Sequence, residues 1–188
     1  MRMLGKTLRK IDKDIVEELS ADLLALTIGL IGGFFLVALT GNIAVIPSLL
    51  ILLPGYLEMH GNLLGSLAGR LSTALQLHKI PRRFSWNTFV HDNILATFVL
   101  GVIVAFVLGL LAYFLTWFIM GEATPAIIAI ALIALIVSLL IEIPLTVAAT
   151  YFSYHHGYDP DDVMGPYVTT LGDFIGILAL LLTFWVVL

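Results

Sequence analysis

Two carboxylates lie inside long apolar stretches of this sequence: Glu142 in SLLIEIPLTVA and Asp173 in TTLGDFIGILA. A charged group inside a membrane costs about 3 kcal/mol on insertion scales, so it normally faces a cavity, a partner or an ion. Thr169 and Gly176 fall on the same helical face as Asp173. A hydroxyl, a carboxylate and bare backbone then form one strip that suits a hydrated cation. Glu142 is open between a structural role in a helix interface and a functional role as a proton-bearing carboxyl.

A second polar stretch, LEMHGNLLGSLAGRLST, occupies residues 57–73. Its glycines recur every four residues, at Gly61, Gly65 and Gly69. This spacing predicts a face on which another helix approaches closely. A neighbouring face, rotated by one residue, carries Asn62, Ser66 and Arg70. That polar face either forms hydrogen bonds between packed helices or lines a water-filled path.

The composition indicates a membrane protein. The mean hydropathy is +1.07, and charged residues make up 12% of the chain, whereas soluble domains have about 25%. Helices satisfy their own backbone hydrogen bonds in lipid, so we expect an all-α, polytopic integral membrane protein. Apolar runs long enough to cross a bilayer predict five transmembrane helices, at 22–40, 43–77, 93–119, 125–152 and 168–188.

The second of these spans is expected to be broken or kinked. As one straight helix, residues 42–77 would reach about 54 Å, which exceeds the thickness of a bilayer. Pro47, Pro54 and Gly55 are natural break points, because proline removes a backbone donor and clashes one turn back. We expect a short first part and a second part that begins near Glu58.

The N-terminal residues 1–20 are predicted to form an amphipathic helix, and residues 21–188 the transmembrane domain. The helix has a narrow apolar stripe and either lies along the inner headgroups or packs beneath the pathway as a gate. Basic residues occur only at 2–13 and 70–83, which marks these segments as cytoplasmic. We therefore expect a plasma-membrane protein with its N-terminus in the cytoplasm and its C-terminus outside.

Two motifs resemble a known family. HGNLLGSLAGRLSTAL, at residues 60–75, resembles the signature of solute carrier family 41, the relatives of the MgtE magnesium channels. The matching residues are the pair Gly61–Asn62 and the segment Arg70–Ala74. GYDPDDVMGPYVTTLGDFIGIL, at residues 157–178, is similar to the family's Asp-Pro-Asp connection and the Gly-Asp of its last helix. The resemblance covers nearly the whole chain.

The resemblance implies a divalent-cation pathway with magnesium as the leading ion. It implies that Asp173 faces the pore and binds the ion, and that Thr169 and Gly176 line the pathway. Bacterial MgtE is a homodimer, so this chain is expected to form one too. Glu58 and His60 are extra to the motif and are candidates for altering selectivity or coupling protons. Glu58 and Glu142 are the possible secondary sites, and Asn62 and Ser66 the further pore-lining residues.

Magnesium chemistry agrees with this interpretation. Mg²⁺ takes oxygen ligands, commonly one or two carboxylates with several waters retained, and the chain has no cysteine from which to build a soft-metal site. A second polar cluster comprises His155, His156, Asp159, Asp161 and Asp162. It is open between a transition-metal site, a magnesium sensor and a solvated loop. No organic cofactor and no nucleic-acid partner is expected.

Two other functional classes are alternatives to transport. An intramembrane aspartyl protease needs two membrane aspartates, and Asp159 and Asp173 follow Tyr158 and Gly172. However, the sequence reads Thr-Leu-Gly-Asp where such enzymes have Gly-x-Gly-Asp, and Asp159 lies in a polar segment beside a proline. A non-transporting membrane scaffold of the same fold is the other alternative. The sequence favours transport across the lipid bilayer without enzymatic activity, and the resemblance implies that a homodimer performs it.

Overall fold

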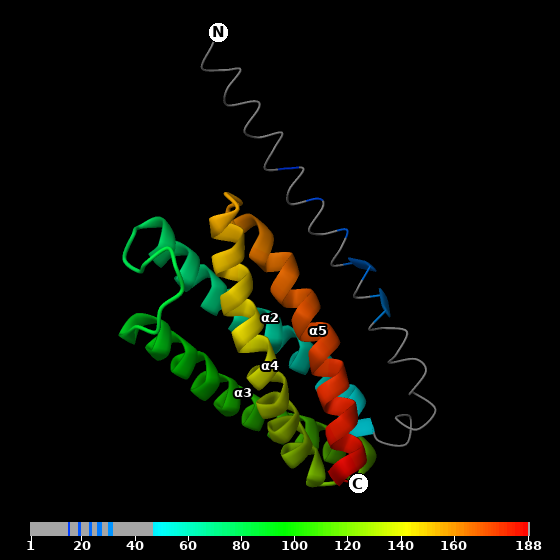
Figure 1. Cartoon of the computed structure of the whole chain (residues 1–188). Helices are drawn as coiled ribbons and strands as arrows, with labels where there is room; N and C mark the ends of the chain where they lie inside the picture. The colour runs from blue at the N-terminus through cyan, green and yellow to red at the C-terminus, as the bar shows by residue number, and fades with distance from the viewer. Residues whose placement is uncertain are drawn as a thin grey trace.

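The computed structural model describes residues 47–187, together with isolated positions between 15 and 31. Residues 47–187 form four long helices (Figure 1): α2 (Pro47–Gln76), α3 (Thr88–Met120), α4 (Ala126–His155) and α5 (Pro160–Val187). The predicted amphipathic helix at 1–20 and the predicted span at 22–40 lie outside the described residues, apart from those isolated positions. An all-helical architecture is confirmed for the described part of the chain.

The prediction that the second span is broken is wrong, because α2 runs as one helix of 30 residues through Pro54. Pro47 is the first residue of the helix, where a missing N–H costs nothing. Pro54 removes a single bond within the helix, and the turns on either side keep theirs. At 1.5 Å per residue α2 is about 45 Å long, so Glu58 lies inside a continuous helix and does not begin one.

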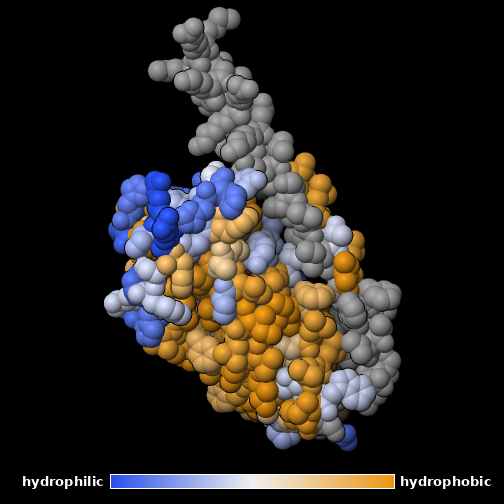
Figure 2. All heavy atoms as spheres, in the orientation of Figure 1, coloured by the Kyte–Doolittle hydropathy of each residue, from blue (hydrophilic) through white to orange (hydrophobic). Residues whose placement is uncertain are grey.

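Three of the four helices, α3, α4 and α5, are long and apolar enough to cross a membrane by length and composition. α2 is not among them, because its polar residues lower its hydropathy. Figure 2 shows a broad apolar surface on one side of the molecule, with hydrophilic residues gathered near the α2–α3 connection. These features support an integral membrane protein, and five spans remain a prediction.

The ends of the helices correct several expected boundaries. α3 begins at Thr88, where the Oδ1 of Asn87 accepts a hydrogen bond from the N–H of Val90 at 3.0 Å. α5 begins at Pro160, earlier than the expected residue 168, and the acidic Asp161 and Asp162 lie in its first turn. Negative charge is favourable there because of the helix dipole. The expected α4–α5 loop is therefore largely helical.

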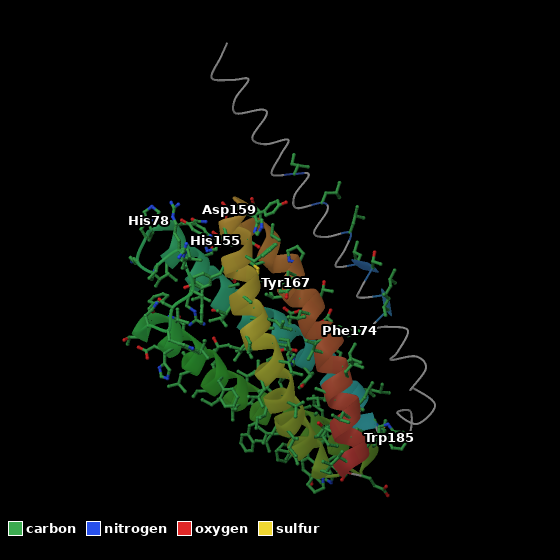
Figure 3. All side chains as sticks on the ribbon, viewed as in Figure 1. His78, His155, Asp159, Tyr167, Phe174 and Trp185 are labelled. Atoms are coloured by element: carbon green, nitrogen blue, oxygen red, sulfur yellow. The ribbon has the colours of Figure 1, made fainter. Side chains whose placement is uncertain are left out.

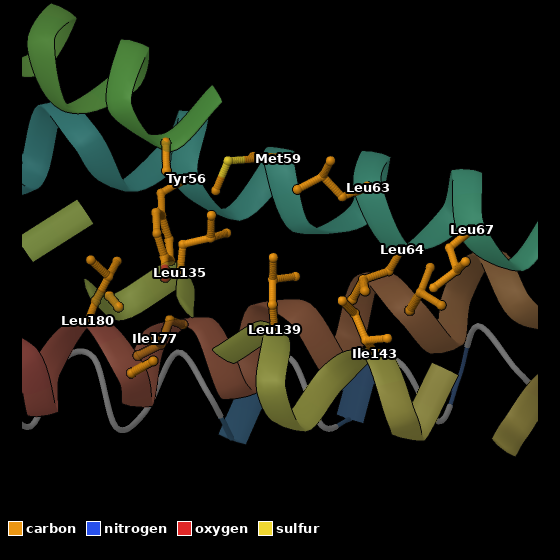
Figure 4. Close-up of a cluster of buried hydrophobic side chains, with 14 of the residues drawn as sticks. Tyr56, Met59, Leu63, Leu64, Leu67, Leu135, Leu139, Ile143, Ile177 and Leu180 are labelled. Atoms are coloured by element: carbon orange, nitrogen blue, oxygen red, sulfur yellow. The ribbon is translucent and has the colours of Figure 1, made fainter. Parts of the chain in front are cut away.

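The helices pack with α2 and α4 at the centre. α2 and α4 contact each other and both of the remaining helices, whereas α3 and α5 do not contact each other within residues 47–187. The core lies where α2, α4 and α5 meet (Figure 4), and its fully buried side chains include Tyr56, Leu64, Leu135, Leu139 and Leu180. This arrangement leaves α5 and one face of α2 side by side at an edge of the bundle.

α2 and α5 run antiparallel, and their contacts fix the register. A Cβ on Gly176 would touch Tyr56, and one on Gly61 would touch Thr169. Further along, the Nε2 of Gln76 donates to the Oδ1 of Asp159 at 3.0 Å. In Figure 3 the labelled Asp159 lies at one end of α5, and Tyr167 and Phe174 follow along it. This register brings the polar stretch of α2 alongside the middle of α5.

Candidate functional site

The polar face of α2, which comprises Glu58, Asn62 and Ser66, is exposed at each of its three positions. The three residues follow one another at four-residue spacing, so they lie in a row along the helix. The Nδ2 of Asn62 donates to the Oε1 of Glu58 at 3.3 Å. A row of exposed polar groups on a helix packed among membrane-spanning helices faces water or a polar partner, because lipid satisfies none of these groups.

α5 contributes Thr169 and Asp173 beside this face. Thr169 is exposed and its Oγ1 donates to the carbonyl of Gly165 at 3.0 Å, so a lone pair on the hydroxyl oxygen stays free to bind a ligand. Asp173 is half-buried and lies midway along α5, about 20 Å from either end. The carboxylate is therefore placed near the centre of a membrane-spanning helix.

The antiparallel register of α2 and α5, set by the contacts of Tyr56 with Gly176 and of Gly61 with Thr169, brings Glu58 and Asp173 to the same level of two adjacent helices. Two like charges in such a position repel, and a bound cation relieves the repulsion. Among the described residues, no group of three or more His, Cys, Asp or Glu side chains is placed to hold a metal ion. The described residues of one chain thus offer a cation a pair of carboxylates with nearby hydroxyl and amide groups, and they form no closed cage around it.

The glycines of α2 allow α5 to approach closely within the same chain. A Cβ on Gly61 would lie 3.4 Å from the Oγ1 of Thr169, and one on Gly65 would lie 3.8 Å from Val168, whereas Gly69 has no neighbour within 4 Å. The expected close helix contact therefore exists for two of the three glycines. Its partner is α5 of this chain.

Gly176 lies away from the exposed strip. It is buried, and a Cβ there would lie 3.4 Å from both the His60 and the Tyr56 rings. In one chain its bare backbone serves the α2–α5 contact, and its role in lining a pathway stays a prediction. The remaining predicted residues, Glu58, Asn62, Ser66, Thr169 and Asp173, lie at the exposed edge where α2 meets α5.

Arg70 does not pair with Asp173. Its Nε donates to the carbonyl of Ser66 at 3.0 Å, and its Nη2 donates to the Oγ1 of Thr97 on α3 at 3.2 Å. Among the described residues, no lysine or arginine forms an ion pair with Asp173. The negative charge of the Glu58–Asp173 pair is therefore not neutralised by a basic side chain of the described part.

His60 points to the opposite side of α2 and joins a buried network with α4. Its Nδ1 donates to the carbonyl of Tyr56 at 2.8 Å, and its Nε2 lies 2.8 Å from the Oγ of Ser138. The Nε2 also lies 3.6 Å from the Oε2 of Glu142, and both side chains are fully buried. His60 therefore lies inside the bundle, away from the exposed edge.

Glu142 is the least satisfied member of this network. Neither of its carboxyl oxygens has a hydrogen bond within the described structure, and the hydroxyl of Thr146, one turn further along α4, has none either. An uncompensated buried charge is strongly unfavourable, and the ionisable group that the described structure places beside Glu142 is His60, at 3.6 Å. The sequence missed the third partner, Ser138, although the four-residue spacing of Ser138, Glu142 and Thr146 is a signal of a polar face on α4.

The His–Asp cluster at the α4–α5 connection has structural partners. The Oδ1 of Asp159 accepts from the N–H of Asp161 at 3.1 Å at the start of α5, as an N-terminal cap does. The Nδ1 of His156 donates to the carbonyl of Phe152 at 2.9 Å. Since residues 47–187 hold no metal-binding group of three such side chains, geometry gives no support to the transition-metal interpretation.

The positions of Asp159 and Asp173 also argue against an aspartyl protease. Asp159 immediately precedes α5, and Asp173 lies midway along it. The rise of the helix separates the two by about 20 Å, whereas a catalytic pair of aspartates shares one proton at about 3 Å. These two residues do not form a proteolytic site within one chain.

A bundle of long apolar helices that holds two carboxylates at an exposed edge defines an integral membrane protein with a candidate intramembrane cation site. The chain belongs to the MgtE family: residues 53–183 match the family model described as a divalent cation transporter. This match confirms the family that the two sequence motifs predicted, and the family is one of transporters, not of enzymes. No curated protein and no solved structure matches the chain.

Proposed function

We propose that this protein carries magnesium across the membrane along the exposed edge between α2 and α5, with Asp173 and Glu58 as the ion-binding carboxylates. The observation that carries the proposal is the register of α2 and α5, which sets these two residues at the same level of adjacent helices along one partly exposed edge. The family match supports divalent cation transport, and the choice of magnesium rests on the chemistry of the groups at the edge.

The charge of the site favours a divalent ion. Coulomb attraction to a given pair of carboxylates is twice as large for a divalent as for a monovalent cation at the same distance. Mg²⁺ sheds water reluctantly and is commonly bound through one or two carboxylates, with its remaining waters retained. Asn62, Ser66 and Thr169 lie along the same edge, and their amide and hydroxyl groups suit the retained waters as hydrogen-bond partners.

A second copy of the chain completes the pathway in this proposal. The exposed polar face of α2 and the carboxylate of Asp173 do not suit contact with lipid. A two-fold symmetric dimer buries the same face on both copies, so the two edges enclose one aqueous path with an Asp173 on each side. We place this homodimer in the plasma membrane, with the N-terminus in the cytoplasm and the C-terminus outside.

The test is ion flux into liposomes that contain the purified protein. Mg²⁺ uptake is measured with an internal fluorescent indicator, and membrane potential and sodium or proton gradients are varied separately. We expect Asp173→Asn to abolish uptake while the protein still inserts and dimerises. The matched control is Glu122→Gln, since Glu122 is an exposed acid in the α3–α4 connection. Uptake by the Asn variant at the unmodified rate overturns the assignment of the site.

A further inference from the structure

An apolar groove lies between α3 and α4, on a part of the molecule that the proposed ion pathway does not use. Its volume is about 810 Å³, and aromatic and aliphatic side chains line it, among them Phe84, Trp86, Phe98, Leu140 and Phe152. Several of these side chains are exposed, including Leu140 at 66% and Phe152 at 60%. The groove is therefore open to its surroundings along the α3–α4 surface.

One end of the groove meets a basic connection. Phe84 and Trp86 belong to the α2–α3 connection, and Phe84 packs edge-on against Tyr151 of α4 with ring centroids 5.6 Å apart. Just before them come Lys79, Arg82 and Arg83, which are exposed. The guanidinium carbon of Arg82 lies 5.8 Å from the ring centroid of Tyr154. This stacking holds Arg82 against the same end of α4.

The basic residues have no acidic partner in the described structure. The ion pairs among the described residues are His60–Glu142 and His91–Asp92, so none of the three cations is neutralised. Lys79 and Arg82 also line a hollow of about 490 Å³ with His78, Ile80 and Pro81. Three unpaired positive charges therefore lie in the connection that leads to Phe84 and Trp86 at one end of the apolar groove.

We propose that this surface is a binding site for an anionic glycerophospholipid. One acyl chain lies in the groove between α3 and α4, and the phosphate lies against Lys79, Arg82 and Arg83. Clusters of basic residues beside membrane helices bind acidic headgroups, and arginine forms charge-assisted, bidentate hydrogen bonds with phosphate. The charge selects an anionic lipid over a zwitterionic one, and the groove selects a lipid over a free phosphate. Trp86, which is 69% exposed, suits the interface between headgroup and chain.

The first experiment is native mass spectrometry of the full chain in mild detergent, titrated with phosphatidylglycerol or with phosphatidylcholine of the same acyl chains. We expect a saturable phosphatidylglycerol adduct whose affinity exceeds that of phosphatidylcholine at least tenfold. The combined change Lys79→Gln, Arg82→Gln and Arg83→Gln should remove this preference. The charge-preserving change Lys79→Arg, Arg82→Lys and Arg83→Lys should largely keep it, which separates charge from folding.

A second pair of variants tests the groove. Ala148→Trp fills it, because Ala148 is exposed and lines it, and we expect at least a tenfold loss of phosphatidylglycerol affinity. Leu145→Trp is the matched control, since Leu145 is exposed on α4 outside the lining and should bind as before. Three outcomes overturn the proposal. They are equal binding of both lipids, displacement of phosphatidylglycerol by inorganic phosphate alone, and variants that change the oligomeric state of the protein without changing its lipid binding.

Discussion

Gly172 of α5 lies directly against His60 of α2: a Cβ built on Gly172 would be 2.7 Å from the Cβ of His60. Real Cβ atoms do not approach so closely, so only glycine fits here without a shift of the helices. Asp173 is the next residue, and Glu58 lies half a turn before His60. The contact between Gly172 and His60 therefore sets how far apart α2 and α5 hold the two carboxylates.

We predict that Gly172→Ala destabilises the protein and impairs Mg²⁺ uptake together. The added methyl group pushes α5 away from α2, and overpacking of this kind typically costs about 1–3 kcal/mol. The melting temperature in mild detergent, followed by tryptophan fluorescence, should fall, and the uptake per folded protein should fall with it.

The matched control for that variant is Gly69→Ala. Gly69 belongs to the same glycine row as Gly61 but has no neighbour within 4 Å. Alanine is the better helix former by about 1 kcal/mol, so this change should leave the melting temperature unchanged or raise it. A larger loss of stability from Gly69→Ala than from Gly172→Ala contradicts the packing described for the two helices.

A second prediction concerns Glu58, which the family signature does not include. If Glu58 and Asp173 bind one ion together, Glu58→Gln weakens the apparent affinity for Mg²⁺ by at least about tenfold, which corresponds to 1.4 kcal/mol. Competition between Mg²⁺ and Na⁺ for uptake should shift toward Na⁺, because the divalent ion gains more from each carboxylate. The measurement is the concentration dependence of initial uptake in liposomes.

The double variant makes this prediction specific. Residues that bind one ion have non-additive effects, so, measured as Mg²⁺ binding to the purified protein, Glu58→Gln should add little to the loss of affinity caused by Asp173→Asn. Glu122→Gln again serves as the control for a lost exposed carboxylate. Normal Mg²⁺ affinity in Glu58→Gln would assign Glu58 to the solvated surface and leave Asp173 alone at the site.

The helix class and the family were predictable from the sequence, because both rest on local signals. Apolar runs identify α3, α4 and α5, and contiguous motifs around Asn62 and Asp173 identify the family. The proline rule failed at Pro54, because one lost hydrogen bond does not break a helix that packs against three others. Local propensity predicts the free-energy cost of a proline inside a helix, whereas tertiary packing determines whether the helix forms despite that cost.

The relationship between Glu58 and Asp173 was not predictable in the same way. It depends on the antiparallel register of α2 and α5, which no local pattern encodes. The glycine spacing in α2 predicted a close helix contact but did not identify α5 as its partner. His60 looked like a neighbour of Asn62 in sequence, yet the helix turns it inward toward Ser138 of α4. Residues that are close together in a sequence motif can therefore lie on different faces of one helix.

A third prediction concerns water access along the exposed edge. Single cysteines at positions 62, 66 and 169 should react with hydrophilic thiol reagents in the membrane-embedded protein, and Mg²⁺ should slow the reaction at position 169. The chain has no cysteine of its own, so no background needs to be removed. Cysteines at positions 103 and 111 of α3, whose native side chains are exposed and apolar, are the controls and should be protected. Equal protection at all five positions would mean that the polar face of α2 packs against other helices and does not line a water-filled path.

The final prediction separates the buried network from the ion pathway. Glu142 and His60 lie on the inner side of α2, with the Oε2 of Glu142 3.6 Å from the Nε2 of His60. Glu142→Gln keeps the shape but removes the carboxyl group beside His60, and the loss of a partner from a buried polar site costs about 1–3 kcal/mol. The melting temperature should fall, and the loss of stability should be smaller in a His60→Gln background, because paired residues show coupling of about 0.5–3 kcal/mol.

Mg²⁺ uptake per folded protein should stay near normal in Glu142→Gln, in contrast to Asp173→Asn. If Glu142→Gln instead stops uptake at unchanged stability, the ion passes through the interior of the bundle, between α2 and α4, and the exposed edge is not the pathway.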